Sequence, residues 1–101
     1  MSRPLPEVFA AALSHHQAGR LERAEALYRR LLAAAPAHPE TLHLLGVLCH
    51  QKGRSERALE LIAKAIAAKG DNAVFHHNLG EVRRALGRLE AAVESYRRAV
   101  E

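Results

Sequence analysis

Apolar residues return along this chain at the spacing of an amphipathic helix. Residues 24–31 (AEALYRRL), 58–66 and 92–100 each place apolar side chains three or four positions apart, and positions with that spacing share one face of a helix. The segments between these stretches carry similar apolar faces, and each segment ends at a break in the pattern. We therefore expect six helices, at about residues 6–18, 21–35, 39–52, 55–69, 73–86 and 89–101.

Glycine and proline residues mark the ends of the predicted helices. Gly19, Gly53 and Gly87 each end an apolar stretch, and glycine there accepts the left-handed conformation of a helix C-terminal cap. The segments APAHP (residues 35–39) and KGDN (residues 69–72) supply longer breaks. Each unit between the longer breaks is predicted to be a pair of amphipathic helices.

The same features repeat with a period of about 34 residues, a spacing typical of stacked helix pairs. Gly46 recurs one period later as Gly80, and Gly53 recurs at the same step as Gly87. Three units follow, at about residues 5–38, 39–72 and 73–101, the last of them incomplete. The repeat predicts a single all-α domain, because one helix pair cannot bury its apolar face without a neighbouring pair.

These units resemble the tetratricopeptide repeat family. The matching residues are Leu45-Gly46 and Leu79-Gly80 on first helices, Ala24 with Tyr28, Ala58 with Ile62 and Ala92 with Tyr96 on second helices, and Pro36 at the end of the first unit. The large aromatic residue that the family has early in the first helix is replaced by Val8, Leu42 and His76. The resemblance implies an α-α superhelix of three tandem helix-turn-helix units, with the first helices lining a concave groove.

Small residues are expected where the two helices of a unit cross. Ala12, Gly46 and Gly80 should face the neighbourhoods of Ala24, Ala58 and Ala92, and larger side chains there would overpack the pair. Tyr28, Ile62 and Tyr96 are then expected to fill the space toward the next unit.

The resemblance also implies a scaffold that binds a peptide or a partner protein segment in the groove. The groove-facing positions carried over from the family are Phe9, Leu13, His16, Gln17, His43, Val47, His50, Gln51, His77, Asn78, Glu81 and Arg84. Asn78 occupies the position at which O-linked N-acetylglucosamine transferase arrays present asparagines that hold a peptide backbone; the alternative is a solvated helix residue. A two-carboxylate clamp for chaperone tails is not expected, because only Arg84 and Asn78 are of the required kind.

The histidines allow more than one interpretation. His43, His50 and His77 could border the same groove, either as solvated or ligand-contacting side chains or as a pH-sensitive cluster. Strong zinc sites use tighter spacing and acidic or thiolate co-ligands, so we expect neither a metal nor a cofactor. His76, adjacent to His77, is expected at a packing position on a different face.

Composition and charge do not suggest a further class of function for this chain. The net charge of +4 is spread along the chain, and the pairs Arg29-Arg30 and Arg97-Arg98 are interpreted as a solvated surface balanced by Glu25 and Glu94, not as a nucleic-acid site. The sequence has no phosphate-binding loop or nucleophile motif, so no enzyme activity is expected. With one cysteine, no apolar stretch of membrane length and no signal peptide, the expected location is cytoplasmic, with no membrane contact.

The third unit stops at Glu101 without a polar capping helix. An apolar face around Leu89, Val93, Tyr96 and Val100 should therefore be partly uncovered. Met1 and Ser2 are typical of a natural start, which favours the N-terminal repeats of a longer bacterial protein, such as the repeat region of a transferase. The alternative is a self-assembly module in which identical chains cover each other's ends as a homo-oligomer.

Overall fold

The computed structural model describes residues 5–101, so Met1 and Ser2, which support the expected start of the protein, lie outside the described residues. Six α-helices follow one another: α1 (Leu5–Gln17), α2 (Leu21–Ala34), α3 (Pro39–Gln51), α4 (Ser55–Ala68), α5 (Ala73–Ala85) and α6 (Leu89–Ala99). Each begins and ends within two residues of its predicted bounds, and residues 5–101 contain no strand. The all-α prediction is confirmed.

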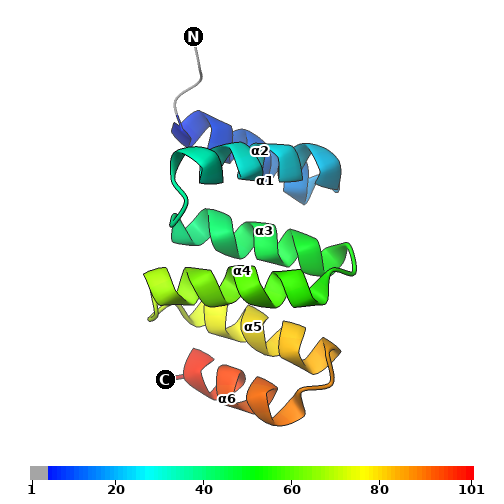
Figure 1. The fold of residues 1–101 in the computed structure, drawn as a ribbon, viewed down its shortest axis with the longest axis vertical. Helices are drawn as coiled ribbons and strands as arrows, with labels where there is room; N and C mark the ends of the chain where they lie inside the picture. The colour runs from blue at the N-terminus through cyan, green and yellow to red at the C-terminus, as the bar shows by residue number, and fades with distance from the viewer. Residues whose placement is uncertain (1–4) are drawn as a thin grey trace.

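The helices pack as three antiparallel pairs, α1 with α2, α3 with α4 and α5 with α6, stacked in one row (Figure 1). Neighbouring pairs meet through α2 with α3 and α4 with α5, and α3 also contacts α5. The stack measures 48 × 25 × 19 Å, with the first pair, α1 and α2, and the last helix, α6, at opposite ends of its long axis. This is the expected superhelix of tandem helix-turn-helix units.

The turn inside each pair is built in the same way three times. Gly19, Gly53 and Gly87 have φ values of 78°, 78° and 77°, a conformation that side-chain-bearing residues rarely adopt. The residue after each glycine donates its backbone N–H to a carbonyl five residues earlier, as from Arg54 to Cys49 at 2.8 Å. The predicted glycine caps are confirmed, and they fix how closely the two helices of a pair run back on each other.

The small residues lie at close helix crossings, but the side chains facing them correct one prediction. A Cβ added to Gly46 would lie 2.7 Å from Ile62 Cγ1 and 3.3 Å from the Ala58 carbonyl oxygen. A Cβ added to Gly80 would lie 2.7 Å from Cε1 of Tyr96. Ile62 and Tyr96 thus pack back onto the first helix of their own unit, against glycines that have no side chain, rather than filling only the space toward the next unit.

His76 is buried at the packing position predicted for it, with 7 % of its surface exposed. Its Nε2 donates a hydrogen bond to the Gly70 carbonyl at 2.7 Å. Gly70 stands where the family has a proline that closes the unit. The imidazole therefore ties the α4–α5 connection to α5 in a unit that lacks the rigid proline.

The far end of the stack presents an uncovered apolar stripe on α6, as predicted. Leu89, Val93 and Val100 are 61 %, 53 % and 85 % exposed. Tyr96 is partly buried, and its hydroxyl donates a hydrogen bond to Glu81 Oε2 at 2.8 Å. Among residues 5–101, no helix is both long enough and apolar enough to span a bilayer.

Candidate functional site

The predicted groove residues all lie on the first helices α1, α3 and α5. Neighbouring first helices are joined by hydrogen bonds between several of these side chains. Three clusters result, one between α1 and α3, one between α3 and α5, and one on α5. The hydrogen bonds within these clusters determine which side-chain donors and acceptors remain free to bind a ligand.

The first cluster links three helices through His16. A carboxamide oxygen can only accept, so His16 Nε2 donates to Gln51 Oε1 on α3 at 2.7 Å. With a proton on Nε2, the ring accepts at Nδ1 from the Tyr28 hydroxyl of α2, 2.8 Å away. Burial raises the pKa of Tyr28 to about 12, so this hydroxyl keeps its proton. The Gln51 carboxamide is held with its NH₂ group left to donate elsewhere.

The second cluster holds Asn78 of α5 against His43 of α3. Asn78 Nδ2 can only donate, so His43 Nε2 accepts this hydrogen bond at 2.8 Å and the neutral ring carries its proton on Nδ1. The His43 ring also stacks on Phe75, with centroids 4.5 Å apart. The contact leaves Asn78 Oδ1 as an acceptor for another partner.

His43 is not an exposed groove histidine that titrates near neutral pH. Its residue surface is only 6 % exposed, and burial lowers its pKa to about 4, although Glu40 opposes the shift. His43 is therefore neutral at neutral pH. The hypothesis of an imidazole cluster titrating near neutrality is wrong for this member, because packing between α3 and α5 removes the water that would stabilise the charged ring.

The third cluster centres on Glu81. Arg84 donates to Glu81 Oε2 at 2.8 Å, Tyr96 donates to the same oxygen at 2.8 Å, and His77 Nε2 lies 3.7 Å from Oε1. The Arg84 and Tyr96 hydrogen bonds lower the pKa of Glu81, so it stays ionised. Exposed His77 and Arg84 border this carboxylate and present a polar edge to solvent.

The other predicted groove residues are not drawn into these clusters. His50 Nδ1 pairs with the Ser55 hydroxyl at 2.9 Å at the start of α4. Leu13 and Val47 are half-buried, and Gln17 is exposed at the end of α1. Phe9 lies edge-on to His38, with ring centroids 5.9 Å apart.

Phe9 opens onto a pocket that the sequence did not reveal. A cavity of about 380 Å³ is lined by Leu5, Pro6, Phe9, Leu31, Ala35, His38 and Glu40. His38 caps α3, with Nδ1 2.6 Å from the Thr41 hydroxyl, and this bond fixes its ring at the pocket wall. A histidine directly before Pro39 at a helix start was the available signal, because it is an unusual capping residue.

The metal-ligating side chains and the arginine pairs have defined surroundings in the part of the chain that the structure describes. No group of three or more His, Cys, Asp or Glu side chains in residues 5–101 could hold a metal ion. Arg29 pairs with Glu25 at 2.7 Å, and Arg98 pairs with Glu94 at 3.3 Å. The arginine pairs thus have the acidic neighbours expected of a balanced surface.

Two family models match the sequence, and both describe the tetratricopeptide repeat. One matches residues 15–77 and the other residues 73–101. The chain belongs to the tetratricopeptide repeat family. A search of curated protein sequences gave no match.

Solved structures of other tetratricopeptide repeat proteins share the fold. The second such domain of Spaghetti (RPAP3), bound to an HSP90 peptide, is 21 % identical with a TM-score of 0.90, over 95 % of this chain and 89 % of that one. SycD of Yersinia enterocolitica, solved as an alternative dimer, is 18 % identical with a TM-score of 0.91, over 98 % and 75 %. MamA is 17 % identical with a TM-score of 0.87, over 95 % of this chain and 56 % of MamA. The chain thus spans little more than half of MamA.

Proposed function

We propose that this tetratricopeptide repeat domain is a non-catalytic scaffold that binds an extended segment of a partner protein along α1, α3 and α5. The observation that carries the proposal is the pair of oriented carboxamides. His16 fixes Gln51 so that its NH₂ group can donate, and His43 fixes Asn78 so that its carbonyl can accept. An extended peptide backbone offers both a carbonyl and an N–H at every residue, and so matches both groups.

Pre-orientation makes these two side chains better suited to binding than ordinary surface amides. Each carboxamide is held by a bond to another helix, so less side-chain entropy is lost when a ligand arrives. The apolar pocket beside Phe9 and His38 can take one apolar side chain of the bound segment. Solved relatives support this use of the fold, since PcrH was solved with the chaperone-binding region of PopD and SycD with a peptide of YopD.

A peptide array probed with purified domain tests the groove. The double variant Gln51→Ala with Asn78→Ala should lose at least about tenfold in affinity for the peptides that the wild type retains, the expected effect of two lost hydrogen bonds. Lys64→Ala, an exposed substitution on α4, is the matched control and should bind as wild type. Equal binding by all three proteins rules out the groove assignment, and an array without any bound peptide rules out the peptide-binding function.

A second candidate function is self-assembly through α6, favoured by the exposure of Leu89, Val93 and Val100. The helix carries Glu90 in its first turn and Arg97 and Arg98 in its last turn. Two copies of α6 packed antiparallel would place Glu90 of each copy near Arg97 of the other and join the apolar stripes. The charge pattern thus fits a symmetric pair.

A further inference from the structure

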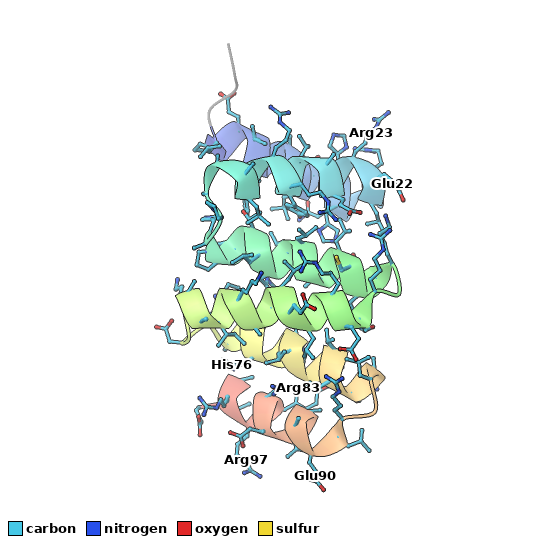
Figure 2. The ribbon with its side chains drawn as sticks, viewed as in Figure 1. Glu22, Arg23, His76, Arg83, Glu90 and Arg97 are labelled. Atoms are coloured by element: carbon cyan, nitrogen blue, oxygen red, sulfur yellow. The ribbon has the colours of Figure 1, made fainter. Side chains whose placement is uncertain are left out.

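A polar pocket lies between α4, α5 and α6 and shares no lining residue with the groove. It has a volume of about 350 Å³. One wall is apolar, made by Ala63, Ile66 and Leu79, and the other carries His76, Arg83, Ser95 and Arg98, with Glu94 beside them. In Figure 2 the labelled His76 and Arg83 lie between α4 and α6. We call it the α4–α6 pocket.

The internal repeat shows how unusual this polar wall is. The positions one repeat before His76, Arg83 and Ser95 are Leu42, Cys49 and Leu61. All three are buried members of the apolar core in the preceding unit. The same three framework positions therefore change together from apolar to polar side chains, and the changes meet in one pocket. Packing alone does not require this, since apolar residues fill the equivalent place one unit earlier.

Each of the two arginines has N–H donors that make no hydrogen bond within residues 5–101. Arg83 uses Nη1 for both of its hydrogen bonds within residues 5–101, to Ser95 Oγ at 2.6 Å and to the Ala91 carbonyl at 3.2 Å. Arg98 uses Nε for Glu94, at 3.3 Å. The two part-buried bonds hold the Arg83 guanidinium in place, Arg98 is tethered only by its surface pair with Glu94, and Nη2 of Arg83 and both Nη atoms of Arg98 remain to donate. Guanidinium groups bind planar or tetrahedral oxyanions through paired N–H groups.

The charge balance of the pocket favours an anion. Within residues 5–101, Glu94 is the one carboxylate of the lining, opposed by Arg83 and Arg98. It is also paired outside the pocket with Arg97, at 4.0 Å. Ligand pockets for small molecules start at about 300 Å³, so the volume exceeds the need of a bare inorganic anion. The apolar wall then selects an anion with an apolar body.

We propose that the α4–α6 pocket is a binding site for a small organic anion, with a phosphate or carboxylate held by Arg83 and Arg98 and an apolar body against Ala63, Ile66 and Leu79. His76 and Ser95 hold the wall in place: His76 through the Gly70 carbonyl, Ser95 through Arg83. The site is separate from the groove on α1, α3 and α5. A test of anion binding in the pocket therefore does not decide whether the groove binds a peptide.

NMR titration of the purified domain with phenyl phosphate tests the site, with benzyl alcohol as the neutral counterpart and inorganic phosphate as the bare anion. Phenyl phosphate should shift the side-chain N–H signals of Arg83 and Arg98 saturably and more tightly than inorganic phosphate, and benzyl alcohol should not. Benzoate should reproduce the effect. Absence of a saturable shift, or binding of benzyl alcohol as tight as phenyl phosphate, overturns the proposal.

Matched variants locate the binding. Arg98→Ala should weaken phenyl phosphate binding at least about tenfold, the scale of a lost charge-assisted contact, whereas Arg97→Ala removes the same charge from the same helix outside the pocket and should change it less than about twofold. The triple variant His76→Leu, Arg83→Cys, Ser95→Leu copies the residues of the preceding unit and should fold, as shown by an unchanged helical circular dichroism spectrum, without binding. Equal weakening by Arg97→Ala and Arg98→Ala overturns the site.

Discussion

Single residues in this repeat take on different roles according to what neighbouring units place against them. His43 and His77 are one repeat apart and occupy the same position on α3 and α5. His43 is enclosed by Phe75 and Asn78 of the next unit, whereas His77 is exposed beside Glu81 in the last unit. Stacking of a further unit, not the residue type, therefore decides whether this imidazole is buried.

His43 should make the domain sensitive to mild acid. Its pKa is lowered from 6.5 to about 4, so the unfolded chain binds a proton before the folded one, and stability falls as pH drops from 6.5 toward 4. The loss should be about 2 kcal/mol. Urea unfolding at pH 7 and pH 4.5 measures it. His43→Gln keeps an acceptor for Asn78 and should remove most of the difference, whereas His77→Gln should leave it unchanged; an unchanged pH dependence in His43→Gln contradicts the assignment.

The two crossing glycines should respond differently to alanine. Gly46 faces fully buried Ile62 and the Ala58 carbonyl, so Gly46→Ala should destabilise by about 1–3 kcal/mol. The three atoms nearest to a Cβ added at Gly80 all belong to the partly exposed ring of Tyr96, and the first unit already combines Ala12 with Tyr28 at the same positions.

Gly80→Ala should therefore cost less than Gly46→Ala, with part of the cost offset by the better helix propensity of alanine. Thermal unfolding of the two variants makes the comparison. In Gly80→Ala the Tyr96 ring should turn away from Glu81, which NMR of the Tyr96 ring would detect. A larger loss for Gly80→Ala than for Gly46→Ala contradicts this reading of the crossings.

At the scale of elements, ion pairs join α2 to the turn after α3, and α4 to the turn after α5. Glu25 of α2 lies 3.1 Å from Lys52 and 3.4 Å from Arg54, both at the turn after α3. Glu56 of α4 lies 2.7 Å from Arg88, the residue equivalent to Arg54 in the next unit. Acidic residues early in α2 and α4 thus meet the basic turn of the next unit, and these contacts help to set the angle at which the units stack.

The Glu25 cluster should stabilise the junction between the first two units. Its pKa is lowered from 4.5 to about 2, chiefly by the Arg29 hydrogen bond and then by Lys52, against desolvation. The stabilisation is present above pH 4.5 and is lost as pH falls toward 2. Glu25→Gln should cost about 1–2 kcal/mol at pH 7, between the values for exposed and buried ion pairs.

Urea unfolding from pH 7 to pH 2 measures this contribution. The control is Glu60→Gln, because Glu60 pairs only with exposed Arg57 within residues 5–101, and it should cost less than about 0.5 kcal/mol. Equal losses for the two variants would show that the Glu25 cluster adds nothing beyond an ordinary surface pair.

Local features of the sequence were sufficient for the helices and their caps, and insufficient for the side-chain network. The six helices were predictable because the apolar periodicity and the cap glycines determine the backbone structure of residues close to them in the sequence. These glycines are Gly19, Gly53 and Gly87. The Asn78–His43 contact joins residues 35 positions apart and depends on how α3 and α5 approach. Burial of His43 follows from that approach, which no pattern within one unit encodes.

At the scale of the whole molecule, the two ends of the stack differ. On α1, the positions equivalent to buried Thr41, Leu45 and Leu48 of α3 carry Glu7, Ala11 and Ser14, which are polar or small. On α6, the outward stripe of Leu89, Val93 and Val100 remains apolar. The second end therefore has the apolar character of an interface.

Antiparallel pairing of α6 with a second copy should make association depend on both apolar area and charge. Val93→Lys should abolish it, because a charge would be buried at the centre of the stripe.

Glu90→Lys and Arg97→Glu should each weaken the dimer, since each places like charges near one another across the two-fold axis. Combined in one chain, they recreate opposite charges in reversed order and should restore association to within about 1 kcal/mol of wild type. Sedimentation equilibrium over a concentration series measures the wild type and the four variants, with Lys64→Ala as the control on a different helix. A wild type that stays monomeric at the highest concentration, or a double variant as weak as the single ones, contradicts the antiparallel pair.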